Sequence, residues 1–304
     1  MRVASLLPSA TEIVCALGAG SELVGVSHEC DYPALVRGLP VLTRSRIDAT
    51  GSSRAIHEAV RSVLQSALSL YAIDEEALAA AAPQVILTQD LCEVCAVSLA
   101  EVQAAVARLP GCGGATVVSL RPKRLADVLG DVERVGQALG RREEAQAVRA
   151  ELERRMAAVV SRALAAPTRP RVVTVEWLDP IMLGGMWMPE LVAMAGGQPL
   201  GPRPGAEAVT IQAADLCALD PEVVLVKPCG FTLPRTLAEL AASPLPPLPG
   251  ARVYATDGSA YFNRPGPRLV ESLEMLAACI HPERFPDLWD AHAPLLRAVP
   301  SVPA

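Results

Sequence analysis

The sequence predicts an α/β fold of two lobes joined by one long helix, and three observations support it. Strand and helix patterns alternate through the first third of the chain, a long run of helical spacing follows, and the alternation then returns. Such alternation is typical of mostly parallel sheets covered by helices. The predicted boundaries are an N-terminal lobe at 1–121, a connecting helix at 122–166 and a C-terminal lobe at 167–304.

The first lobe opens with a short apolar strand and then a helix. Pro8 follows the strand, and Ser9 with Glu12 forms the S-x-x-E pattern of a capping box. The free N–H groups at this helix start could hold an anion or a carbonyl. The predicted strands are residues 3–7, 23–26, 85–88 and 116–120, and the predicted helices are residues 9–17, 53–66, 74–82 and 98–109.

The connecting helix is predicted from apolar residues that keep a 3.6-residue spacing from Leu125 to Leu139. Helical composition continues to about Leu164, and Gly136 and Gly140 are expected to weaken the helix without ending it. The prolines of “APTRPR” then end it. In the second lobe the predicted strands are residues 171–175, 223–226 and 253–255, and the predicted helices are residues 189–195, 211–219, 236–242 and 267–279.

Composition excludes several classes of function. The chain has 304 residues, of which 51% are hydrophobic and 20% charged, with a formal net charge of -6. This charge and the lack of a basic stripe argue against a nucleic-acid partner. No apolar run approaches the roughly 20 residues of a membrane span, so membrane insertion is not expected. We also find no G-x-S-x-G elbow, Walker loop or H-E-x-x-H motif, so the sequence lends catalysis little support.

Residues with useful chemistry gather where the predicted strands end. In open parallel sheets, ligands bind beyond the carboxyl ends of the strands. If the two lobes face each other across these ends, residues far apart in the chain would line one cleft. The residues that follow the strands are Pro8, Ser9, His28, Cys30, Tyr32, Gln89, Cys92, Cys95, Glu176, Trp177, Lys227, Cys229, Phe231, Tyr261, Phe262, Asn263 and Arg264.

The cysteines raise a separate question, because “VILTQDLCEVCAVS” carries a C-x-x-C pair. One interpretation is a redox pair at a helix start, although the usual Trp-Cys-Gly-Pro-Cys type of sequence is absent. A second is a zinc or iron–sulfur site formed by Cys30, Cys92, Cys95 and Cys229. The third is that these cysteines are uncharged lining of a cleft.

Three stretches resemble one known family. “RVASLLPSATEIVCALGAGSELVGVSHECDYP”, “GGMWMPELVAMAGG” and “YFNRPGPRLVESLEML” are similar to the vitamin B12-binding members of the ABC-transporter substrate-binding proteins. In this helical-backbone metal receptor type, two Rossmann-like lobes are joined by one long helix, and the ligand lies in the cleft between them. The resemblance covers nearly the whole chain and implies a protein that binds cobalamin or another corrinoid.

The resemblance also implies which residues contact the corrinoid. The implied contacts are Pro8 and Tyr32 in the first lobe, and Trp177, Tyr261, Phe262 and Arg264 in the second. We add Ser9 for its helix-start N–H, Gln89 for a cleft position that is often aromatic in the family, and Glu176 and Trp187 for their places beside the predicted cleft. Glu176 needs a partner if it is buried, and Arg264 is the expected one.

Two features depart from the exported members of that family. The chain shows no secretion signal, and residues 47–73 form an extra segment. We therefore expect a cytoplasmic branch of the family, in which contact with an ABC permease is doubtful. The expected partner is a small metal-chelate ligand.

Two alternatives to corrinoid binding stay open. One is a cytoplasmic metalloprotein in which the four cysteines hold zinc or an iron–sulfur cluster, with a catalytic role left open. The other is a regulatory or adaptor protein that binds no small ligand and uses the predicted cleft between the lobes as an interface with a partner.

Overall fold

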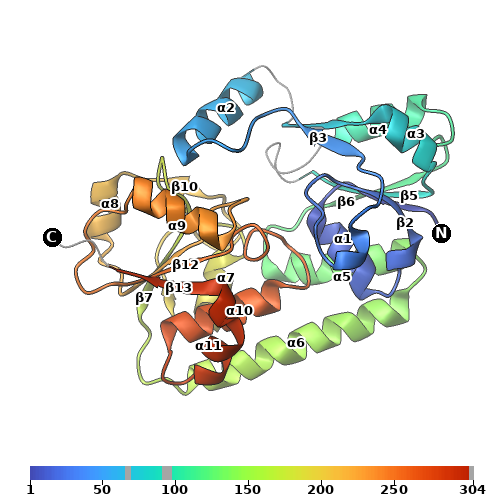
Figure 1. The fold of residues 1–304 in the computed structure, drawn as a ribbon. Coiled ribbons are helices and arrows are strands. Elements are labelled where there is room, and N and C mark those ends of the chain that lie inside the picture. The colour runs from blue at the N-terminus through green and yellow to red at the C-terminus, as the bar shows by residue number, and fades with distance from the viewer. Residues whose placement is uncertain (66–69, 91–97, 301–304) are drawn as a thin grey trace. The chain divides into compact units, whose positions relative to one another are not determined.

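The computed structural model describes residues 1–65, 70–90 and 98–300, and these form two compact units (Figure 1). The first unit comprises Met1–Gly51, Ala55–Pro122 and Ala126–Glu151. The second comprises Ser52–Arg54, Lys123–Leu125 and the chain from Leu152 onward. Each unit contains a sheet with parallel strands at its centre and helices around it, so the predicted α/β fold is confirmed. The domain boundaries and the cleft between the lobes stay predictions.

The first unit is built on a parallel sheet whose strands run in the order β2-β1-β5-β6. These strands are β1 (Val3–Ser5), β2 (Leu23–Val26), β5 (Val85–Gln89) and β6 (Thr116–Leu120). In Figure 1, α3 (Glu75–Ala81) and α4 (Leu99–Arg108) cover one face, while α1 (Pro8–Ala16) and α5 (Leu125–Ala138) lie on the other. Short 3₁₀ turns occur at Gly20–Glu22 and Ala34–Val36.

The core of this unit follows from strand alternation, because every second residue of a strand points to the same face. Ile86 of β5 packs with Leu78 of α3 and Val102 of α4. Both helices begin at side-chain caps of the expected kind. The Asp74 carboxylate accepts from the backbone N–H of Ala77 at 2.9 Å, and the Ser98 hydroxyl accepts from that of Glu101 at 3.2 Å.

The capping box predicted at Ser9 is wrong. Helix α1 begins at Pro8, its cap residue is Leu7, and no side chain bonds the cap. Proline fits the first helical position because its φ is already suitable and it has no N–H to leave unpaired. Ser9 therefore lies inside the first turn, where its side chain is buried.

The extra segment at 47–73 contributes a hairpin strand and a helix. Strands β3 (Thr43–Ser45) and β4 (Tyr71–Ile73) pair antiparallel, and α2 (Ser53–Gln65) lies between them in the chain. The pairing joins Thr43 to Ile73 and Ser45 to Tyr71. Sequence patterns predicted α2 but not these two strands, which are only three residues each.

The connecting segment is two helices rather than one. Helix α5 ends at Ala138, and α6 (Arg142–Leu164) begins after a turn in which Gly140 has a φ of +70°. Glycine adopts this left-handed conformation without a Cβ clash and is a common helix terminator. The long joining helix is therefore α6 alone. The division between the two units falls inside it, between Glu151 and Leu152.

The second unit contains a mixed sheet in the order β10-β8-β7-β11-β12-β13, with β9 also paired to β7. Strands β7, β11 and β12 are parallel to one another, whereas β8, β10 and β13 join antiparallel. The bounds are β7 (Arg171–Trp177), β8 (Met182–Leu183), β9 (Gln198–Pro199), β10 (Val209–Thr210), β11 (Val223–Val226), β12 (Arg252–Thr256) and β13 (Leu296–Val299).

Helices cover both faces of this sheet (Figure 1). Val175 and Val226 pack with Leu216 of α8 and Leu240 of α9 on one face. On the other face, the Thr256 hydroxyl lies 3.8 Å from the sulfur of Met275 in α10. The helices are α7 (Met188–Met194), α8 (Ala213–Ala218), α9 (Leu233–Ala242), α10 (Leu269–Ile280) and α11 (Pro286–His292), with a 3₁₀ turn at Ala293–Leu295.

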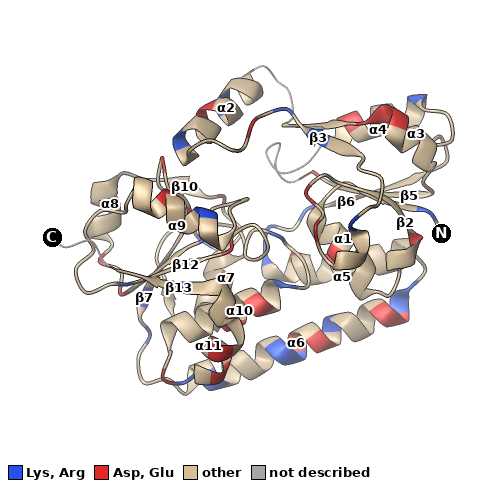
Figure 2. Ribbon diagram, in the orientation of Figure 1, with Lys and Arg blue, Asp and Glu red and all other residues tan. Residues whose placement is uncertain are grey.

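Charged side chains lie mainly outside these cores. Figure 2 shows Arg and Glu interspersed along α6, which is typical of a solvated helix face. Arg155 of α6 donates to Glu271 at 3.0 Å and to Glu274 at 2.8 Å, both in α10. Within the described part of the chain, no helix has the length and apolar character needed to cross a membrane.

Candidate functional site

The second unit brings the predicted binding residues together at one edge of its sheet. Strands β7, β11 and β12 are neighbours and parallel, with Val175 beside Val226 and Val226 beside Ala255. Their carboxyl ends therefore lie at the same edge, where ligands bind in open α/β sheets. We call this the second-unit edge. It comprises Glu176, Trp177, Lys227, Cys229, Phe231, Tyr261, Asn263 and Arg264.

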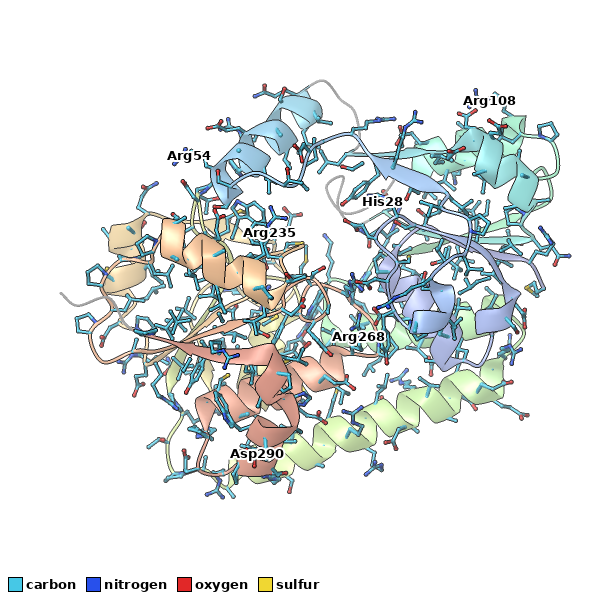
Figure 3. All side chains as sticks on the ribbon, viewed as in Figure 1. His28, Arg54, Arg108, Arg235, Arg268 and Asp290 are labelled. Carbon is cyan, nitrogen blue, oxygen red and sulfur yellow. The ribbon has the colours of Figure 1, made fainter. Side chains whose placement is uncertain are left out.

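Trp177 lies at this edge in a tilted aromatic contact with Phe231. Its ring lies 5.3 Å from that of Phe231 at an interplanar angle of 59°, and the Arg235 guanidinium lies 3.8 Å from the centre of the Phe231 ring. Figure 3 labels Arg235 on α9, from which its side chain reaches the ring of Phe231. Phe231 is buried, whereas Trp177 stays partly exposed. Phe231 therefore packs behind the indole of Trp177, which is still exposed enough to contact a ligand.

Tyr261 and Arg268 form a second aromatic contact, with the guanidinium carbon 5.0 Å from the ring centre. Tyr261 is partly exposed, and burial raises the pKa of its hydroxyl. Arg264 is 9% exposed. Phe262 is fully buried and Trp187 is 6% exposed, so in this conformation neither ring is open to solvent.

A buried lysine ties the loops of the edge together. Lys227 is fully buried, and its ammonium donates to Glu176 at 2.9 Å and to the side-chain oxygen of Asn263 at 2.7 Å. Sequence analysis placed Lys227 at this strand end without a role, and it expected Arg264 to neutralise Glu176. The structure instead assigns Lys227 to that carboxylate.

The first turn of α2 also contacts the second-unit edge, because Ser52–Arg54 belong to this unit. The indole N–H of Trp177 donates to the carbonyl oxygen of Ser53 at 3.1 Å. The Arg54 guanidinium, labelled in Figure 3, makes two hydrogen bonds to Asp179 at 2.7 and 2.9 Å. The start of the extra segment is thus fastened beside Trp177.

In the first unit, the ends of β1 and β2 carry a small polar network. The Thr11 hydroxyl lies 2.8 Å from the Ser5 hydroxyl and 3.1 Å from the sulfur of Cys30. Pro8 and Ser9 stand at the start of the same helix, α1. The network keeps Cys30 in a defined place near a helix start, partly exposed to solvent.

A second network surrounds His28, which Figure 3 labels. Its Nδ1 lies 2.7 Å from the Thr43 hydroxyl, and its ring makes an edge contact of 4.9 Å with Tyr71. His28 is thus a hydrogen-bonded loop residue. Tyr32 is 49% exposed, whereas Gln89 is 5% exposed at the end of β5. Both stay predicted contacts of the ligand.

The cysteine site receives no support from the described residues. Cys92 and Cys95 lie outside them, Cys30 belongs to the first unit, and Cys229 belongs to the second. Within residues 1–65, 70–90 and 98–300, no group of three or more His, Cys, Asp or Glu could hold a metal ion. The zinc or iron–sulfur site therefore stays a prediction that the described residues do not support.

Sequence reasoning missed the roles of Lys227, Asn263 and Arg235. One signal was present for the first of them, because a lone lysine directly after four apolar strand residues is placed where burial is common. The partners of Lys227 come from residues 51 and 36 positions away, and sequence spacing alone does not pair them.

Comparisons with known proteins agree with the fold. A model of the family “Periplasmic binding protein” matches residues 3–245. A periplasmic heme binding protein from Pseudomonas aeruginosa has a TM-score of 0.71 at 20% identity, covering 100% of this chain and 99% of that one. The periplasmic vitamin B12 binding protein BtuF of Vibrio cholerae has a TM-score of 0.62 at 19% identity, covering 92% and 96%. No curated protein matches.

These findings correct the predicted location. From the pattern of the N-terminal residues we expected a cytoplasmic branch of the family. The matching family is one of periplasmic proteins, and both of these solved structures are of periplasmic proteins, so the cytoplasmic prediction is wrong. The family match spans well over half of the chain and agrees with its two-unit α/β architecture. The chain belongs to the periplasmic binding protein family.

Proposed function

We propose that the protein binds a metal-bearing macrocycle of the tetrapyrrole type, with a corrinoid as the expected ligand and haem as the alternative. The observation that carries the proposal is the aromatic second-unit edge, where Trp177 packs at a tilt on Phe231 and Tyr261 lies beside Arg268. Flat, partly exposed aromatic rings suit a large planar ligand, and neighbouring cations suit its acidic groups.

The similar structures support this ligand class. One is a vitamin B12 binding protein, and several are heme binding proteins, of which one was solved with two hemes. Both ligands carry a metal at the centre of a wide ring system. As a member of this family, the protein would present its ligand to an ABC permease.

The proposal assigns direct contact at the second-unit edge to the partly exposed rings of Trp177 and Tyr261 and to the guanidinium of Arg264, which is 9% exposed. In the first unit it assigns contact to Pro8 and Tyr32, with the helix-start N–H of Ser9 and the largely buried amide of Gln89 as polar contacts. Trp187 and Phe262 support the loop behind Tyr261 rather than cover the ligand, and Glu176 is paired with Lys227.

Titration of the purified protein with hydroxocobalamin and, separately, with hemin tests the proposal. Binding should shift the absorbance of the macrocycle and quench tryptophan fluorescence. Trp177→Ala and Tyr261→Ala should each weaken binding about tenfold or more, since each ring removed costs over 1 kcal/mol.

Trp289→Ala is the matched control, because Trp289 packs on Tyr254 with ring centres 5.7 Å apart, away from the second-unit edge. Its affinity should equal that of the wild type. If neither hydroxocobalamin nor hemin binds to the wild type, or if the control loses as much affinity as Trp177→Ala, the proposal is wrong.

A further inference from the structure

Lys227 is an unusual residue to find fully buried. An isolated ammonium is costly to remove from water unless it is paired and hydrogen-bonded. Here the ammonium donates to the Glu176 carboxylate at 2.9 Å and to the Asn263 amide oxygen at 2.7 Å. Its two acceptors come from the end of β7 and from the loop after β12. One side chain thus joins the ends of three neighbouring strands.

Backbone groups around Lys227 also hold Asn263 in place, and two glycines allow the close packing that this requires. The Asn263 amide nitrogen donates to the carbonyl oxygens of Lys227 at 3.0 Å and of Gly258 at 2.8 Å. A Cβ added to Gly258 would lie 2.6 Å from the Lys227 carbonyl oxygen, so only glycine allows this approach. A Cβ on Gly184 would lie 2.6 Å from the Thr174 hydroxyl and 3.3 Å from Cε of Lys227.

The residues held by Lys227 adjoin the proposed ligand contacts. Glu176 precedes Trp177 in β7, and Asn263 follows Tyr261 by two positions. Lys227 itself is closed off from solvent and would not touch a ligand. Glu176, however, has a side chain that is 25% exposed, so its charge would face the edge if Lys227 did not neutralise it.

We propose that Lys227 is a positioning residue for the ligand, which orients Trp177 and Tyr261 through Glu176 and Asn263 and neutralises the Glu176 carboxylate. This inference rests on the proposed function of the second-unit edge. It makes the edge selective for the charge of the ligand, because an unpaired Glu176 would repel acidic groups such as the propionates of haem.

Lys227→Met tests the inference, because methionine keeps most of the length of the side chain and removes the ammonium. The affinity for hemin should fall about tenfold or more, since the partly exposed Glu176 carboxylate loses its charged partner and would repel the propionates. The affinity for hydroxocobalamin, which lacks the two free carboxylates, should fall less. Adding Glu176→Gln to Lys227→Met should restore part of the hemin affinity by removing the repulsive charge.

Arg171→Met is the matched control, because Arg171 lies at the opposite end of β7 and pairs with Asp220 at 2.8 Å. It should leave both affinities unchanged. The inference is overturned if Lys227→Met binds hemin as the wild type does, or if Arg171→Met loses as much affinity. If Lys227→Met does not fold, Asn263→Ala removes one of the two acceptors and leaves Glu176 paired, so the affinities for hemin and for hydroxocobalamin should both fall, to a similar and smaller extent.

A ligand-free measurement separates this inference from the proposed function. The near-ultraviolet circular dichroism that distinguishes the wild type from Trp177→Phe reports the fixed orientation of Trp177. That contribution should shrink in Lys227→Met and persist in Arg171→Met. A wild type that binds neither macrocycle refutes the proposed function, whereas an unchanged Trp177 signal in Lys227→Met refutes the positioning role.

Discussion

The indole nitrogen of Trp187 lies 2.8 Å from the carbonyl oxygen of Phe262, and both side chains are withdrawn from solvent. Phe262 has a left-handed backbone with a φ of 56°, and its N–H donates to the Ser272 hydroxyl at 2.9 Å. A left-handed conformation is unfavourable for a bulky residue and needs support from its surroundings. The two hydrogen bonds supply that support for the loop that carries Tyr261.

Trp187→Phe should destabilise the protein by about 1–3 kcal/mol, because it leaves the buried carbonyl of Phe262 without its donor. Urea denaturation followed by circular dichroism measures this loss. Trp289→Phe is the control, since the ring of Trp289 is partly exposed and packs on Tyr254. Equal destabilisation by both variants would contradict a special role for the Trp187 bond.

Because of Asp131, we expect the free energy of unfolding to fall as the pH rises. Burial raises the pKa of its carboxyl to about 7, which outweighs the opposing effect of Arg134. Between about pH 4 and pH 7 the unfolded carboxyl is ionised while the folded one keeps its proton, so the unfolded state binds fewer protons and stability declines. Asp131→Asn cannot titrate and should lose this decline, on the order of a few kcal/mol.

Urea denaturation at pH 4 and at pH 8 measures the effect. The free energy of unfolding of Asp131→Asn, taken relative to that of the wild type, should be higher at pH 8 than at pH 4. Asp127→Asn, on the exposed side of the same helix, should show a much smaller gain. A wild-type curve with no difference from Asp131→Asn at either pH would refute the prediction.

Because of Glu274, we expect the free energy of unfolding to rise with pH in the acid range. Burial raises the pKa of this carboxyl, but hydrogen bonds from His292 at 3.0 Å and from Arg155 at 2.8 Å outweigh burial and hold it below its usual value of 4.5. A depressed pKa contributes stability that is present above the unfolded pKa and lost as the pH falls through the folded one. Glu274→Gln should therefore cost about 1–3 kcal/mol at pH 7 and progressively less below pH 4, by urea denaturation.

Much of the fold could be predicted because its signals are local. The strands Leu23–Val26, Thr116–Leu120 and Val223–Val226 have the bounds expected from apolar runs between turn residues. The break between α5 and α6 could not be predicted, because helical composition continues through it. The helix ends there because Gly140 adopts a left-handed turn. Strands of two or three residues, such as β8 and β9, are set by their partners and leave no periodic pattern.

The candidate site divides in the same way. Strand-end placement found Trp177, Tyr261 and Glu176, because position after a strand is a property of the sequence. The partner of Glu176 depends on which strand becomes its neighbour in the sheet. A short-range pattern does not reveal that β7 lies beside β11, and so Arg264 was expected where Lys227 is found.

The two exposed cysteines of the second unit provide a test of the second-unit edge. Among the described cysteines, Cys217 and Cys229 are exposed, whereas Cys112 and Cys279 are buried. Iodoacetamide should therefore modify Cys217 and Cys229 in the native protein, and Cys112 and Cys279 only after unfolding. Burial also raises the pKa of the Cys279 thiol, which further lowers its reactivity because the thiolate is the nucleophile.

The ligand should change the reactivity of only one of these exposed cysteines. Cys229 lies in the loop after β11, between Lys227 and Phe231, whereas Cys217 lies in α8. Saturating hemin or hydroxocobalamin should slow the alkylation of Cys229 several-fold and leave that of Cys217 unchanged, as measured by mass spectrometry of the digested protein. Slowing of both thiols would indicate a change in the whole unit. No slowing of either, with a ligand that binds, would place the macrocycle away from the loop after β11.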